Sequence, residues 1–151
     1  MPTFGTRTNG CPYIERPSAY AIVRNASACV ALVRTPKGAY LPGGGIEAGE
    51  TPEQAICREG IEEAGLILAP RSQLGRAIEI VYSAEENTCF EKQCVFIEAD
   101  VVGQTASHES DHQLIWVDLD QAIRILSPES HRWILQSYSR HPSGNSSAAP
   151  E

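Results

Sequence analysis

The chain has 151 residues and a mass of 16.4 kDa, and its 42% hydrophobic and 21% charged content is typical of one globular domain with its own core. It carries 19 acidic and 12 basic residues, a formal net charge of −7. Non-specific nucleic-acid binding depends on basic contacts to phosphates, so this balance argues against it, but not against a small phosphate-bearing ligand. No apolar stretch approaches the roughly 18 residues needed to cross a bilayer, and residues 1–16 contain no apolar signal core. We therefore expect a cytoplasmic protein with neither a membrane nor nucleic acid as partner.

The cysteines are odd in number and include no Cys-x2-Cys pair: Cys11, Cys29, Cys57, Cys89 and Cys94. This pattern argues against a complete disulfide framework and gives no support for a zinc site. We expect free thiols in a reducing compartment.

The N-terminal segment 1–17 is polar and interrupted by glycines and prolines, so we expect an irregular arm before a domain at 18–141. Short apolar runs bounded by turn residues then predict three strands, at 20–23, 28–34 and 39–41.

A loop and a helix follow these strands. Leu41–Gly45 is a tight turn whose glycines let the backbone approach a ligand closely. Thr51 then supplies a hydroxyl N-cap, Pro52 the first helical position and Gln54 the third residue of a capping box. Gly65 is the expected left-handed C-cap, so the helix is predicted to run from Pro52 to residue 64.

In the second half, runs at 74–83 and 89–99 predict an antiparallel pair joined across 84–87, and 114–117 predicts a further strand. Two helices are expected after it, one from Asp118 to about Leu126 and one capped by Ser127 and running to about Arg140. The Ser/Ala/Pro/Gly-rich tail at 142–151 is predicted to be disordered. This mixed order favours an α+β or α/β sandwich with a mixed β-sheet between helices.

Three carboxylates follow helical spacing near the end of the first helix. Glu59, Glu62 and Glu63 stand at i, i+3 and i+4 and would share one helix face, where like charges repel. A solvated acidic face is the usual explanation for such a stripe. A divalent cation such as Mg²⁺, which prefers oxygen ligands, is the alternative.

The segment that contains this stripe resembles the motif of the Nudix (MutT-like) hydrolases, Gly-x5-Glu-x7-Arg-Glu-U-x-Glu-Glu-x-Gly-U, where U is a bulky aliphatic residue. The residues on its fixed positions are Gly44, Glu50, Arg58, Glu59, Glu62, Glu63, Gly65 and Leu66. One position departs, because Gly60 occupies the first U. Restoring an aliphatic residue there is expected to raise stability by roughly 0.5–1 kcal/mol if space allows. The resemblance favours a metal site over a solvated acidic face as the explanation of the three glutamates. It also implies an α/β/α sandwich.

The resemblance also implies a reaction, the hydrolysis of a pyrophosphate bond in a nucleoside diphosphate linked to another moiety. It implies that Glu59, Glu62 and Glu63, helped by the Gly43 carbonyl, hold Mg²⁺ or Mn²⁺. ADP-ribose, dinucleoside polyphosphates, nucleoside triphosphates and nucleotide sugars all remain open as substrates.

Arg58 is expected to have a structural role by the same resemblance. It precedes Glu59 but lies about 100° away around a helix. We therefore expect it to form an ion pair with Glu50, or alternatively with Glu47, and to face away from the metal.

The general base is sought in the loop 107–113. Many relatives place a glutamate near the position of Gln113. Here Glu109 is the first choice and Glu62 the second, while His108 and His112 could titrate near neutral pH.

Arg34 stands close to the glycine loop in sequence and is a candidate substrate contact. A solvated arginine at the end of a strand is an equally good explanation.

The expected partner is a small nucleotide, and a homodimer is compatible with the sequence but not indicated by it. A non-catalytic Nudix-fold sensor of a nucleotide or ADP-ribose is the alternative function. Such sensors typically lose the glutamates that this chain keeps.

Overall fold

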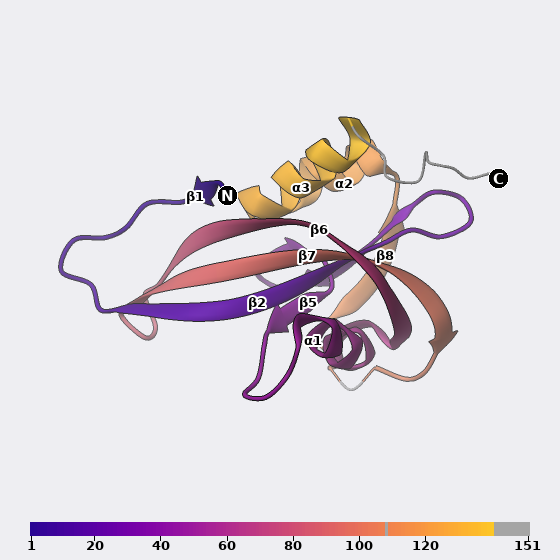
Figure 1. Ribbon diagram of the computed structural model, residues 1–151, viewed down its shortest axis with the longest axis horizontal. Coiled ribbons are helices and arrows are strands. Elements are labelled where there is room, and N and C mark those ends of the chain that lie inside the picture. The colour runs from indigo at the N-terminus through magenta and orange to yellow at the C-terminus, as the bar shows by residue number, and fades with distance from the viewer. Residues whose placement is uncertain (108, 141–151) are drawn as a thin grey trace.

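The computed structural model describes residues 1–107 and 109–140. Two β-sheets form its centre, and helices lie on both sides of them (Figure 1). The five-stranded sheet has the order β1-β6-β7-β2-β5 and the three-stranded sheet the order β4-β3-β8. The strands are β1 (Thr3–Phe4), β2 (Tyr13–Val23), β3 (Val30–Thr35), β4 (Gly38–Tyr40), β5 (Gly43–Gly45), β6 (Leu66–Ser83), β7 (Thr88–Gln104) and β8 (Gln113–Val117). The expectations for His108 and for the tail at 142–151 lie outside the described residues.

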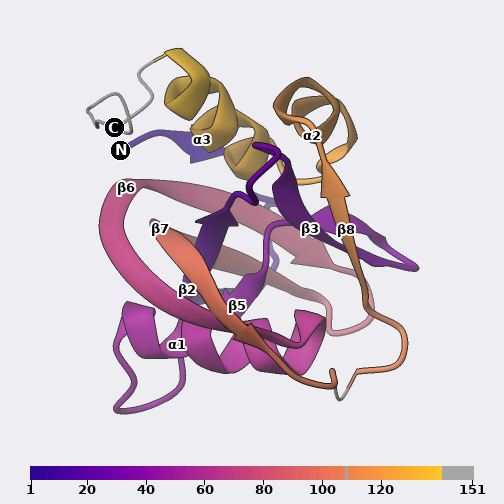
Figure 2. The same ribbon diagram turned by 90° about the vertical axis from the view of Figure 1, so that its right-hand side faces the viewer.

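The helices form the outer layers of a sandwich. Helix α1 (Pro52–Glu59) continues into the π-helical turn η1 (Gly60–Ala64), whereas α2 (Leu119–Ile125) and α3 (Glu129–Arg140) follow β8. Figure 2 shows α1 on one side of the sheets and α2 and α3 on the opposite side. Strands β2 and β7 are parallel, whereas β6 and β7 are antiparallel. The predicted α/β/α sandwich with a mixed sheet is therefore confirmed.

Alternation along β2 explains how one sheet holds two helical layers. Tyr20 and Ile22 point into a core cluster completed by buried side chains of α2 and α3. Ala19, Ala21 and Val23 point the other way, into a cluster that contains the buried residues of α1. Because side chains of a strand alternate between its two faces, one apolar run serves both cores.

The predicted irregular arm at 1–17 is wrong for two stretches. β1 pairs in parallel with β6, and β2 begins at Tyr13, where it enters an unbroken parallel register with β7 that starts at Cys89. Residues 14–17 of β2 are exposed, so they carry no apolar periodicity. Backbone pairing with the long strand β7 specifies this part of β2, and that partner is invisible in the local sequence.

The antiparallel pair predicted for 74–83 and 89–99 is confirmed, but both strands are longer than expected. β6 already begins at Leu66 and β7 runs on to Gln104. Their register shifts three times between Ile67 and Gly75. Such bulges let a proline and a glycine lie within a paired strand, and those residues are what hid its first half from the sequence pattern.

The two C-terminal helices were predicted correctly. Asp118 caps α2, its carboxylate accepting the Gln121 N–H at 2.8 Å, and α3 begins at Glu129 directly after Ser127-Pro128.

All five cysteines are free thiols in the structure. Among the residues described, no helix is long and apolar enough to span a membrane.

The start and the C-cap of the first helix also match the prediction. The Thr51 hydroxyl accepts the Gln54 N–H at 3.1 Å, and the Gln54 side chain accepts the Thr51 N–H at 2.9 Å, which completes the capping box. Gly65 is left-handed, with φ of 66°. Between these ends the helix does not remain α-helical, because it widens into η1 at Gly60.

The gain expected from an aliphatic residue at Gly60 depends on free space, and the structure shows that this position is closely packed. A Cβ placed on Gly60 would lie 2.9 Å from Leu68 Cδ1 and 3.1 Å from the Leu66 carbonyl oxygen. Both neighbours belong to β6, which packs against η1. The space that an aliphatic side chain would fill is therefore already taken by Leu68.

We predict that Gly60→Leu lowers the free energy of unfolding by about 1–3 kcal/mol, as for overpacking of a close-packed core. Urea denaturation of both proteins measures the difference. Gly45→Ala is the matched control, since a Cβ on Gly45 meets nothing within 4 Å. A Gly60→Leu protein as stable as wild type would show that Leu68 can move aside.

Candidate functional site

Five acidic or imidazole side chains gather where η1 faces the loop between β7 and β8. One carboxylate oxygen from each of Glu59, Glu62 and Glu109 lies within 4.8 Å of the others. Glu63, Glu109 and a ring nitrogen of His112 form a second group within the same limit. Glu109 belongs to both groups, so the loop completes a cluster that the helix begins. We call these five residues the acidic cluster.

The loop is tied to the helical turn by its own contacts. The Ser107 hydroxyl donates to the Glu62 carbonyl at 2.8 Å. His112 Nε2 lies 3.2 Å from Glu109 Oε1 and 3.8 Å from Glu63 Oε2, while its Nδ1 lies 2.8 Å from Asp111. These contacts hold Glu109 over η1, beside the helix glutamates, and its role as general base stays a prediction.

Burial of negative charge dominates the electrostatics of the cluster. Desolvation raises the pKa of Glu63 to about 8, and neighbouring carboxylates add to this although the Gly43 N–H opposes it. Burial likewise raises the pKa of Glu59, with the repulsion of Glu62 and Glu109 as further causes. Carboxyl groups held in this way gain from a cation among them. Because their donors are hard oxygen atoms, the cluster fits a divalent cation such as Mg²⁺ or Mn²⁺.

The glycine turn is shaped to the cluster. The Gly43 N–H donates to Glu63 Oε1 at 2.9 Å. A Cβ on Gly44 would lie only 2.5 Å from Glu59 Oε2, so a larger residue would displace that carboxylate. The backbone group seen to meet the cluster is thus the Gly43 amide, and the ligand role expected of the Gly43 carbonyl stays a prediction.

Arg58 connects the glycine loop to the helix. Its Nε and Nη2 donate to the two oxygens of Glu50 at 2.8 and 3.1 Å, and Nη2 also donates to the Gly45 carbonyl at 3.0 Å. Glu47 is more distant, at 3.7 Å. The hydrogen bonds from Arg58 hold the pKa of Glu50 below its usual value. The structure thus brings Arg58 to Glu50 in the bidentate geometry that stabilises such pairs.

Arg58 does not face away from the acidic cluster, and this expectation was wrong. Its Nη1 lies 3.2 Å from Glu62 Oε1 and 3.3 Å from Glu59 Oε2. A guanidinium carries five N–H donors on a long stem, so it can serve Glu50 and two cluster glutamates at once. The angle around the helix constrains the Cβ atom and not the far end of the side chain.

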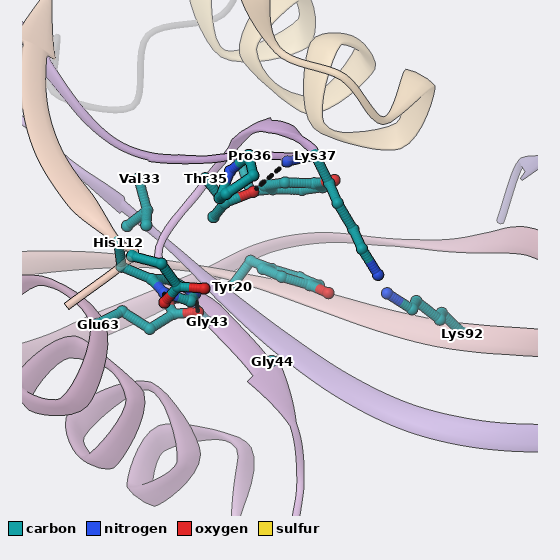
Figure 3. A pocket seen from close by; sticks show the side chains of 12 residues that line it. Tyr20, Val33, Thr35, Pro36, Lys37, Gly43, Gly44, Glu63, Lys92 and His112 are labelled. Atoms are coloured by element: carbon teal, nitrogen blue, oxygen red, sulfur yellow. Dashed lines mark hydrogen bonds and ion pairs between the residues drawn. The ribbon is translucent and has the colours of Figure 1, made fainter. Parts of the chain in front are cut away.

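A cavity of about 420 Å³ opens beside the cluster (Figure 3). Glu63 and His112 line one end, Gly43 and Gly44 the floor, and the turn at 35–37 the opposite wall. Tyr20 and Tyr40 are buried or half-buried within it.

Arg34 is not among the described residues that line this cavity. It is exposed, pairs in register with Gln113 and borders a neighbouring hollow that shares Asp111 and His112 with the cavity. The structure instead places Lys37 and Lys92 on the cavity wall, two residues that sequence reasoning missed. Lys37 could have been noticed, because its turn lies only a few residues before the glycine turn, whereas nothing local marks Lys92.

Solved structures share this fold. A Nudix hydrolase from Nitrosomonas europaea has a TM-score of 0.66 and 20% sequence identity, covering 83% of this chain and 88% of its own. A MutT protein from Methanosarcina mazei Go1 has a TM-score of 0.63 and 22% identity, covering 91% and 100%. A MutT Nudix hydrolase from Burkholderia pseudomallei has a TM-score of 0.58 and 24% identity, covering 81% and 96%. At these identities the similarity shows the fold alone.

A search of curated proteins found no match. The model of the NUDIX domain, however, matches residues 14–138, which include the whole glycine turn, α1, η1 and the loop that carries Glu109. With that match over most of its length, the chain belongs to the Nudix family and is MutT-like in fold.

Proposed function

We propose that this protein is a metal-dependent hydrolase that cleaves the pyrophosphate bond of a nucleoside diphosphate linked to another moiety. The observation that carries the proposal is the acidic cluster, in which carboxylate oxygens from η1, α1 and the loop between β7 and β8 lie within 4.8 Å of one another beside a cavity. Family membership supports hydrolase activity in general, and the cluster supports the choice of reaction.

Glu59, Glu62 and Glu63 would hold Mg²⁺ or Mn²⁺, with the Gly43 carbonyl as a further ligand. When bound, such a cation neutralises charge on phosphoryl oxygens and acidifies water. The Gly43 N–H keeps the Glu63 carboxylate turned toward the cavity.

Glu109 is the general base in this proposal, and Glu62 is the alternative. Glu109 comes from the loop, outside the motif, and its carboxylate is about one-third exposed beside the cluster, so water can reach it. His112 Nε2 lies 3.2 Å from Glu109 Oε1 and would orient it to accept the proton of the attacking water.

A substrate panel tests the reaction class. ADP-ribose, dinucleoside polyphosphates, nucleoside triphosphates and nucleotide sugars are each incubated with the protein and Mg²⁺ or Mn²⁺, and the products are separated by ion-exchange chromatography. Hydrolysis of at least one compound at its pyrophosphate bond is expected. No hydrolysis of any would refute the proposal.

We predict that excess EDTA abolishes this activity. We also predict that Glu62→Gln lowers kcat at least about tenfold, because the loss of an anionic ligand weakens binding of the metal. The exposed hairpin residue Glu85, changed to Gln, is the matched control and should leave kcat unchanged. Activity that persists in EDTA after trace metal has been removed would end the metal hypothesis.

For Glu109→Gln we expect kcat to fall by about 10²- to 10⁴-fold, because a general base contributes on that order. Mn²⁺ affinity, measured by calorimetry, and melting temperature should change little, in contrast to Glu62→Gln. A loss of Mn²⁺ affinity as large as that of Glu62→Gln would make Glu109 a ligand.

For Arg58→Ala we expect a melting temperature lower by a few degrees, with kcat and Mn²⁺ affinity both reduced, because Glu50 and the glycine loop lose their anchor. The control is Arg71→Ala. Arg71 also pairs with two carboxylates, but it is 49% exposed against 22% for Arg58 and should matter less. An Arg58→Ala protein of wild-type stability with only a raised KM would place Arg58 on the substrate instead.

A further inference from the structure

Two lysines meet across the cavity, at the end away from the glutamates. Lys37 lies in the turn between β3 and β4, and Lys92 lies on β7. Both line the same cavity, and in Figure 3 their amino ends point toward one another, beyond Tyr20 from Glu63 and His112. Two chain segments far apart in sequence therefore supply like charges to one space.

Neither ammonium group has an acidic partner within 4.0 Å among residues 1–107 and 109–140. The cross-strand neighbour of Lys92 is Glu79, but a carboxylate oxygen of Glu79 accepts the Ser130 N–H at 2.8 Å. In a chain with 19 acidic and 12 basic residues, two ammonium groups that face each other without a carboxylate repel one another, and an anion between them would relieve that repulsion.

Lys92 also links this space to the acidic cluster. It lines a neighbouring cavity of about 380 Å³ together with Gly44, Arg58 and Glu59. Its register partner on β2, Arg16, lines that cavity as well. Lys92 and Gly44 thus line both the cavity that contains Lys37 and the cavity that contains Glu59.

We infer that Lys37 and Lys92 form an anion subsite for a phosphate group of the substrate outside the scissile pyrophosphate. A phosphate group has several acceptor oxygens and can bind two ammonium groups that approach from different walls. The subsite favours nucleoside triphosphates and other polyphosphates over nucleotides that end in a neutral sugar. The inference rests on the proposed function for the place of the scissile bond.

The test compares Lys37→Gln/Lys92→Gln with Arg76→Gln/Arg124→Gln, a control that removes two exposed charges outside the cavity. The substrates are a nucleoside triphosphate and a nucleotide sugar with the same base and a neutral sugar. In the lysine variant, KM for the triphosphate should rise roughly tenfold or more, as expected for losing charged hydrogen bonds. KM for the nucleotide sugar and kcat for both should change little. Lys37→Arg combined with Lys92→Gln keeps one positive charge, and it should recover part of the triphosphate affinity that the double glutamine variant loses.

An equal rise in KM for both substrates would place the lysines on the shared diphosphate and overturn the inference, as would no rise at all. The same rise in the arginine control would assign the effect to the overall field of the protein. Melting temperatures check folding, and the single variant Lys37→Gln, in an exposed turn, repeats the comparison if the double variant unfolds.

Binding of inorganic tripolyphosphate in EDTA, measured by calorimetry, separates this inference from the proposed function. If the wild type hydrolyses nothing, the reaction proposal fails, yet tripolyphosphate binding that is lost only in the lysine variant would still support the subsite. Absence of binding to wild type, or equal binding to all variants, would overturn it.

Discussion

The arrangement of the site depends on the hydrogen bonds and ion pairs of Arg58. It binds Glu50 through two hydrogen bonds and the Gly45 carbonyl through a third, and the same guanidinium touches Glu59 and Glu62. One side chain therefore fixes the loop before α1 and offsets repulsion within the acidic cluster. A lysine offers no such fork of donors, which is why the bidentate pair requires arginine.

Arg58 compensates the negative charges of the acidic cluster unevenly. Its contacts reach Glu59 and Glu62, whereas burial raises the pKa of Glu63 to about 8 and the Gly43 N–H opposes this rise. Glu63, whose carboxylate lies within 4.8 Å of ligand atoms of Glu109 and His112, therefore lacks a charged partner from Arg58 and lines the cavity.

Close packing explains the one departure from the family motif. An aliphatic residue is expected at position 60, but here Leu68 of β6 comes so close that a Cβ would lie 2.9 Å from it. The chain therefore fills the same volume from the neighbouring strand. The wider turn of η1 begins at this glycine and contains Glu62 and Glu63.

Sequence reasoning succeeded where the signal is local and failed where it is not. The capping box at Thr51, the hairpin of β6 and β7 and both C-terminal helices follow from residues within a few positions of one another. The first half of β2 is exposed and is specified by pairing with β7, about 75 residues later, which no local pattern records. Within the site, motif spacing located the glutamates, but the reach of Arg58 and the approach of Lys92 depend on side-chain length and on strand order.

The charges of the site are separated along the cavity, and this separation constrains what can bind. An anion approaching a protein of net charge −7 is repelled by the acidic cluster unless a cation is present there, whereas Lys37 and Lys92 attract it at the other end. Tyr20, which is buried, lies between the two ends of the cavity. The fold thus keeps opposite charges apart within one cavity, so that each remains available to a ligand and not to the other.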